Sequence, residues 1–120
     1  MAGTIVADTI QDGAGNSTSM DNAIYGSAKA WCNYNGSTST NNGSYNISSV
    51  TRSSAGNYAF AFTTAMSSAG YAVTVGFANT TTNTSTASNV LSLTTTGFSI
   101  QHIENGATVD ANPICIAVFR

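Results

Sequence analysis

The sequence predicts an all-β fold: an antiparallel β-sandwich of about seven strands, preceded by an extended N-terminal arm. Ser, Thr and Asn make up about two fifths of the 120 residues, and these residue types favour strands and turns over long helices. Two stretches, residues 58–62 and 71–78, alternate large and small side chains with a period of two. Strand signals then recur at a spacing of roughly 10 to 15 residues, which is typical of a sandwich.

Residues 1–28 are predicted to be an arm, or tether, for a β-sandwich knob domain of residues 29–120. A short strand is expected within residues 4–10, because β-branched side chains gather there, and turn-forming residues follow it. Residues 20–29 could hold one helical turn, which Gly26 would end. The arm therefore has local structure but no periodic apolar face.

Three apolar side chains of the arm, Ile5, Val6 and Ile10, are the candidate contacts with a partner. They are too few to bury as an independent unit, so the arm is expected to be mobile in the free protein. On a partner it would order by augmenting a sheet edge or by inserting these side chains into a groove.

The body strands are predicted from alternation and from the turn residues between them. They are placed near residues 30–35, 45–51, 57–64, 71–78, 89–94, 97–103 and 113–119. Along each strand, every second residue is expected to point its side chain into the core, and the large side chains occupy these positions. These side chains are Tyr58, Phe60, Phe62, Tyr71, Val73, Val75, Phe77, Leu91, Leu93, Phe98, Ile100, Ile114, Ile116 and Val118.

The composition excludes several classes of partner. Charged residues are only 7% of the chain and the formal net charge is -2, so the electrostatic footprint of a nucleic-acid binder is absent. No stretch approaches the roughly 18 apolar residues of a membrane-spanning helix, so no membrane insertion is expected. The first residues also lack the basic region and apolar core of a signal peptide, which indicates synthesis in a cytoplasm.

No constellation of residues indicates an enzyme, a cofactor or a metal site. The acids are scattered over the arm and the loops, at Asp8, Asp12, Asp21, Glu104 and Asp110. The single histidine, His102, has no partner for a nucleophile system, and it is expected to be a polar strand residue rather than a metal ligand at an axis between three copies.

Two cysteines, Cys32 and Cys115, lie on the first and last predicted body strands, which could be neighbours. In a chain made in a cytoplasm, such a pair is more often reduced than bridged, but the sequence leaves both states open.

Three aromatic residues near predicted loops, Trp31, Tyr34 and Tyr45, are candidate glycan contacts. Exposed aromatic rings can stack on sugars, whereas positions on period-two strands favour packing in the core or between subunits. Packing is the preferred interpretation.

Several segments, in order, resemble a terminal domain of bacteriophage fibre proteins. They are Lys29–Gly36, Tyr45–Val50, Asn57–Met66, Tyr71–Val73 and Ile114–Phe119. The family pattern has a Lys-Ala-Trp opening, an Asn-Gly turn, an "FTTAM" strand end and a short apolar last strand, and the same pieces occur here in that order. The opening, Thr4–Asn16, is also similar to the first residues of phage fibre and head-fibre proteins.

This resemblance implies a structural virion protein of a bacteriophage on the virion surface. It would be a homotrimeric capsid decoration (cement) protein or head-fibre knob, whose arm binds the major capsid protein or another virion protein. The alternative is the receptor-binding tip of a tail fibre that recognises host-surface carbohydrate. Fewer than about 30 residues precede the body, too few for a fibre shaft, which favours the capsid.

A second resemblance, to H-type lectins, rests on the aromatic strand 58–62, on residues 95–100 and on the last strand. It implies a trimeric sandwich and carbohydrate binding. The end of the chain, Ile114–Arg120, supplies no counterpart of the residues with which those lectins hold a sugar, so no lectin site is transferred.

Overall fold

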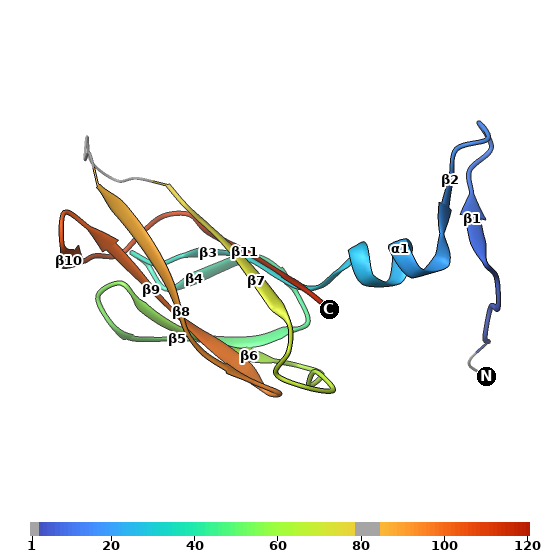
Figure 1. The fold of residues 1–120 in the computed structure, drawn as a ribbon. Coiled ribbons are helices and arrows are strands. Elements are labelled where there is room, and N and C mark those ends of the chain that lie inside the picture. The colour runs from blue at the N-terminus through green and yellow to red at the C-terminus, as the bar shows by residue number, and fades with distance from the viewer. Residues whose placement is uncertain (1–2, 79–84) are drawn as a thin grey trace.

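The structure, a computed structural model, describes residues 3–78 and 85–120. Two antiparallel sheets pack face to face, and an arm extends away from one end of this sandwich (Figure 1). The all-β sandwich predicted from the sequence is therefore confirmed.

The larger sheet has five strands. Strand β9 (Gly97–Glu104) lies between β6 (Asn57–Phe62) and β8 (Thr86–Thr94), and β5 (Ile47–Ser54) pairs with the far side of β6. The short strand β10 (Ala107–Thr108) returns along the end of β9. Every pairing in this sheet is antiparallel, and all but the β6–β9 pair join strands that are consecutive in the chain.

The smaller sheet has the strand order β4 (Thr40–Tyr45), β3 (Ala28–Asn35), β11 (Ile114–Phe119), β7 (Ala72–Phe77). Its two central strands are the first and the last long strands of the body. The end of the chain thus lies inside a sheet, as the sequence predicted, because the apolar residues of β11 need cover on one face.

The seven predicted body strands correspond to β3, β5, β6, β7, β8, β9 and β11. Strands β4 and β10 were missed. Residues 40–42 of β4 fall in a segment predicted to be a loop, because the strand reads TNNGSY and has no alternation of large apolar side chains. Its pairing with β3 forms it instead. The predicted loop 79–88 lies partly outside the described residues, since residues 79–84 are not described.

The core lies between the sheets and consists mainly of aromatic and branched side chains. Tyr58, Phe60 and Phe62 are buried while Ala59 between them is exposed, so the predicted period of two in β6 is correct. The Phe60 and Phe98 rings stack with centroids 5.0 Å apart, within the larger sheet. The buried apolar residues are Ala30, Cys32, Tyr34, Ile47, Tyr58, Phe60, Phe62, Met66, Tyr71, Phe98, Ile100, Ala111, Ile114, Ile116 and Val118.

Two residues predicted to face the core, Leu91 and Leu93, are 55% and 40% exposed. Leu93 does pair with Phe98 on the core side of the sheet, but β8 pairs only with β9, so the smaller sheet leaves it partly uncovered. At Leu91 a β-bulge shifts the register, and an inserted residue reverses the alternation of faces. The prediction for these two leucines was wrong for these two reasons.

Close approach of neighbouring groups requires glycine at two positions. A Cβ atom on Gly36 would lie 2.3 Å from the Tyr58 hydroxyl oxygen, and one on Gly97 would lie 2.2 Å from the Phe60 carbonyl oxygen. Any larger residue would have to displace the buried Tyr58 ring or the β6 backbone.

The arm forms a small unit of its own rather than an eighth strand of the sandwich. Strands β1 (Thr9–Gln11) and β2 (Ser17–Ser19) make a hairpin, and helix α1 (Met20–Gly26) follows directly. The helix predicted near residue 20 is confirmed, and its N-cap is Ser19, whose hydroxyl oxygen accepts a hydrogen bond from the Asn22 amide at 3.2 Å. No residue from 3 to 26 is buried.

Candidate functional site

The candidate partner contacts of the arm all lie on its surface. Val6 is 93% exposed, and Ile5 and Ile10 are also exposed. Helix α1 adds Ile24 and Tyr25, two exposed large side chains that no apolar period in the sequence marks as surface contacts. The arm thus presents an apolar surface that the sandwich does not cover.

The three aromatic glycan candidates separate onto two faces of the smaller sheet. Trp31 pairs directly with Tyr45 across β3 and β4, and these side chains are 45% and 59% exposed. Tyr34 is only 3% exposed and packs edge-on against Tyr58 in the core, with centroids 5.9 Å apart. Tyr34 therefore cannot offer its ring to a sugar, and its assignment as a glycan contact was wrong.

Two rows of the outer face of the smaller sheet are otherwise made of uncharged, mostly small residues. In the row that contains Trp31, the neighbour on β11 is Ala117 and the next residue across, on β7, is Thr74. In the next row Asn33 is followed by Cys115 and Gly76, both of which carry small side chains or none. Trp31 and Tyr45 thus stand at one side of a low, neutral surface.

A pocket of about 570 Å³ opens beside Tyr45. The segment that links β6 to β7 forms one wall, and the start of β3 and the end of β11 contribute the two basic side chains. The lining residues are Lys29, Tyr45, Asn46, Thr63, Thr64, Ala65, Met66, Ser67 and Arg120.

Asn46 fixes the shape of this pocket. It lies between β4 and β5 with φ of 54°, a left-handed conformation that Asn tolerates better than most residues. Its side-chain nitrogen, Nδ2, donates to the carbonyl oxygens of Lys29 and Thr64, each at 3.2 Å. Its side-chain oxygen, Oδ1, accepts from the Thr64 backbone amide at 2.7 Å. One side chain therefore ties β3 to the opposite wall. The left-handed turn also explains why the predicted strand 45–51 is divided here.

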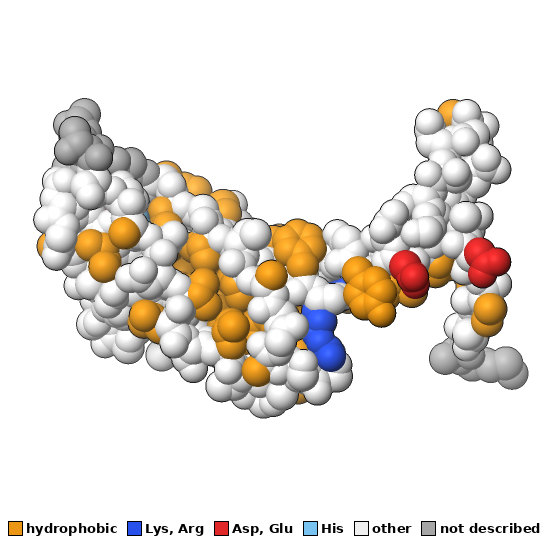
Figure 2. Space-filling view, in the orientation of Figure 1, with side chains coloured by type: hydrophobic (Ala, Val, Ile, Leu, Met, Phe, Trp, Pro, Cys, Tyr) orange, Lys and Arg blue, Asp and Glu red, His pale blue; other side chains and the backbone are white. Residues whose placement is uncertain are grey.

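The pocket has an unusual share of the protein's positive charge. The sequence contains three Lys and Arg residues, and two of them, Lys29 and Arg120, line the pocket, whereas no Asp or Glu does. The Lys29 ammonium donates to the Ile24 carbonyl and, at 2.8 Å, to the Ser27 hydroxyl. On the face shown in Figure 2, Lys and Arg atoms lie where the arm leaves the sandwich, and acidic atoms lie on the arm.

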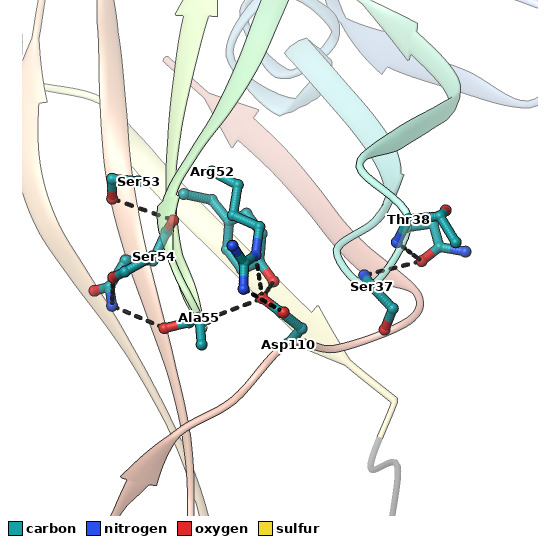
Figure 3. A network of polar contacts seen from close by, with 11 residues as sticks. Ser37, Thr38, Arg52, Ser53, Ser54, Ala55 and Asp110 are labelled. Carbon is teal, nitrogen blue, oxygen red and sulfur yellow. Dashed lines mark hydrogen bonds and ion pairs between the residues drawn. The ribbon is translucent and has the colours of Figure 1, made fainter.

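The third cation, Arg52, belongs to a polar cluster at the β5–β6 turn (Figure 3). Its guanidinium donates to both carboxylate oxygens of Asp110, at 2.8 and 2.7 Å. The same carboxylate accepts from the Tyr58 hydroxyl at 2.5 Å and from the Gly56 amide at 3.1 Å. Asp110 thereby connects the β5–β6 hairpin to the segment before β11, and it is not one of the simply solvated loop acids that the sequence suggested.

The same contacts explain two pKa shifts. Hydrogen bonds from Arg52 hold the pKa of Asp110 well below its usual range. Burial, and then the hydrogen bond to Asp110, raise the pKa of Tyr58 above its ordinary value. Both groups therefore keep their charge state throughout the physiological pH range, so the cluster is suited to holding the fold rather than to proton transfer.

A second buried polar pair lies inside the sandwich. His102 Nε2 is 3.0 Å from Glu104 Oε1, and both side chains are buried. The imidazole also stacks on Phe77 with centroids 4.2 Å apart, and its Nδ1 atom has no hydrogen-bond partner. Since His102 is fully buried, it cannot meet other copies at an axis. The sequence does contain a signal for this burial, because His102 follows Phe98 and Ile100 at every second position of the same strand, and those two side chains face the core.

The two cysteines lie on neighbouring strands but on opposite faces of the smaller sheet. Cys32 pairs in register with Ile116 and is buried, whereas Cys115 pairs with Asn33 and is exposed. Both thiols are free, and burial raises the pKa of Cys32 to about 11. Their positions explain why neighbouring strands do not bring the two sulfur atoms into a bridge.

Within residues 3–78 and 85–120, no group of three or more His, Cys, Asp or Glu residues could hold a metal ion. The part of the chain that the structure describes contains no helix long and apolar enough to cross a membrane. Comparisons with protein-family models, with curated proteins and with solved structures found no match. The arm and the pocket beside Tyr45 are therefore the two features from which a function can be inferred.

Proposed function

We propose that this protein is a structural virion protein of a bacteriophage, a trimeric capsid decoration protein or head-fibre knob that its N-terminal arm attaches to the particle. The sandwich would be the exposed knob, and the major capsid protein or another virion protein would be the arm's partner. The observation that carries the proposal is the arm, which has defined secondary structure but buries none of its own side chains.

Such a unit is marginal in isolation. Two-stranded hairpins and helices shorter than about 12 residues have little stability in water without tertiary packing. Here the strands have three residues each and α1 has seven. A partner that covered Ile5, Val6 and Ile10 would supply the missing burial, at about 25 cal/mol for each Å² of apolar surface removed from water. This is why the arm fits a tether.

The test compares full-length protein with two variants in co-sedimentation with capsids that lack the protein. Deletion of residues 1–19 removes the hairpin but keeps α1 and the sandwich. The full-length triple variant Ile5→Ser/Val6→Ser/Ile10→Ser removes only the apolar contacts. Both are expected to melt at nearly the wild-type temperature and to lose capsid binding.

Leu91→Ser is the matched control, because it removes an exposed apolar side chain from the sandwich instead of the arm. It is expected to bind normally. Full occupancy by the deletion variant would place attachment in the sandwich and refute the proposal. Failure of the deletion variant to fold would mean that the arm is an integral part of the domain.

The trimer is part of the same proposal. The neutral outer face of the smaller sheet, with Ala72, Gly76 and Ala117, supports it because small side chains let another subunit approach closely. Light scattering on the full chain is expected to give three times 12.2 kDa. A stable monomer at micromolar concentration would refute the trimer.

The alternative function, a receptor-binding tip that recognises host-surface carbohydrate, is supported by one observation. Trp31 and Tyr45 stand side by side with exposed rings, next to a pocket. A glycan array probed with the full chain tests this alternative, because absence of any selective carbohydrate signal would refute a receptor-binding tip.

A further inference from the structure

We propose that the pocket bounded by Lys29, Tyr45 and Arg120 binds a sugar that carries a carboxylate, such as a uronic acid unit of an acidic polysaccharide. This proposal goes beyond attachment to a particle, and it holds whether the knob belongs to a capsid or to a fibre. The pocket volume of about 570 Å³ lies within the range of roughly 300 to 1,000 Å³ that is usual for small-molecule sites.

The charge distribution indicates an anionic ligand. In a chain with so few cations, two line one pocket, and the third is occupied by Asp110. Lys29 uses two of its three donors on the arm and keeps one, while Arg120 makes no hydrogen bond within the described residues. A guanidinium with free donors is suited to a planar carboxylate, which it can bind with two parallel hydrogen bonds.

The backbone of the pocket wall favours a carboxylate over a phosphate. Phosphate sites commonly use a series of free backbone N–H groups. Here three amides of the wall are already occupied: Thr63 donates to the Asn46 carbonyl, Thr64 to the Asn46 side chain and Met66 to the Thr95 carbonyl. The remaining amides of the wall, those of Ala65 and Ser67, are not consecutive, so the wall offers no series of free N–H groups and the two basic side chains are the main groups that can hold an anion.

The remaining lining fits a polyhydroxylated ring. The hydroxyls of Thr63, Thr64 and Ser67 are exposed and have no hydrogen-bond partner in the described part of the chain, so each can donate to and accept from a sugar hydroxyl. The exposed Tyr45 ring offers a flat apolar face for the C–H side of a sugar. Trp31, its cross-strand neighbour, could contact a second sugar unit.

The experiment titrates the full-length protein with methyl glucuronide and with methyl glucoside, which has the same ring without the carboxylate, and follows binding by ligand-observed NMR. One charge-assisted contact is worth about 1.5 kcal/mol, so the glucuronide is expected to bind roughly tenfold more tightly. Arg120→Gln and Lys29→Gln should each remove most of that advantage and leave glucoside binding unchanged. Tyr45→Ala should weaken both sugars.

Tyr25→Ala is the control, because it removes an exposed tyrosine that does not line the pocket. Its affinities are expected to match wild type. Melting curves check that each variant folds, and Arg120→Gln changes only an exposed side chain beyond the end of β11. Equal affinity for the two sugars, absence of saturable binding, or equal competition by inorganic phosphate would overturn the proposal. None of these outcomes depends on attachment to a capsid.

Discussion

The polar cluster around Asp110 is expected to contribute measurably to the free energy of unfolding. The Tyr58 hydroxyl lies at the edge of the core and donates to Asp110. Asp110→Ala leaves that hydroxyl proton without an acceptor, at a cost of about 1 to 3 kcal/mol. The loss of the partly exposed Arg52 contact adds up to about 1 kcal/mol, so the expected total is about 1 to 4 kcal/mol.

The second variant, Tyr58→Phe, removes the hydroxyl and leaves Asp110 paired with Arg52. In the wild-type background it should cost about 1 kcal/mol, the usual net value of one hydrogen bond. In the Asp110→Ala background it should be neutral or stabilising, because it removes a group that has lost its acceptor. Urea unfolding of the four proteins measures this cycle, with Asp21→Ala, an exposed acid of the arm, as a control within about 0.5 kcal/mol. Strict additivity of the two changes would refute the account of the cluster.

The pKa of Asp110 adds a dependence on pH. Its folded-state pKa lies below the unfolded value of about 3.9, because Arg52 and Tyr58 donate to the charged form. The stability that this carboxylate contributes is therefore complete above the unfolded pKa and is lost as the pH falls through acid values. Between pH 5 and pH 2, wild type should lose more free energy of unfolding than Asp110→Asn. Equal losses would show that the shifted pKa does not control acid unfolding.

Three further predictions concern other positions, and the first two are measured by urea unfolding. Asn46→Gly should lower the free energy of unfolding by about 2 to 3 kcal/mol, because three hydrogen bonds are lost. Asn46→Ala should lower it by about 1 kcal/mol more, because φ at position 46 is positive and alanine is strained there. Equal costs would contradict the argument from the backbone conformation. Phe60→Ala should cost about 3 to 5 kcal/mol by urea unfolding, whereas Leu91→Ala should cost under about 1 kcal/mol, and similar losses would mean that the bulge is wrongly placed. Iodoacetamide should label Cys32 only after unfolding, since Cys32 is buried with a raised pKa; rapid labelling of Cys32 in the folded protein would contradict its placement.

The sequence predicted best where burial follows a strict alternation. Strand β6 and the first half of β9 have large side chains on one face, and a one-residue slip would expose all of them, so their register is strongly determined. Prediction failed where pairing or a bulge overrides the pattern. Strand β4 is polar and depends on β3, and the bulge at Leu91 could not be read from a run of Val, Leu, Ser and Leu.

For the candidate sites, the alternation of faces along a strand already predicts part of which side chains are exposed. Trp31 and Tyr34 are three positions apart on one strand, so they must face opposite sides, and only one of them can be exposed. Other features depend on contacts between distant segments, which no local pattern encodes. Asp110 meets Arg52 across 58 positions of sequence, and Asn46 meets Thr64 across 18.

Lys29 connects the two proposed functions of the molecule. Its ammonium holds the end of α1 through Ile24 and Ser27, and its side chain lines the pocket. Because an ammonium has three donors, it can keep both contacts to the arm and still bind a carboxylate. Sugar binding and an ordered arm are therefore compatible. Loss of Lys29 should weaken both, whereas loss of Arg120, which makes no hydrogen bond or ion pair with the described part of the arm, should weaken sugar binding alone.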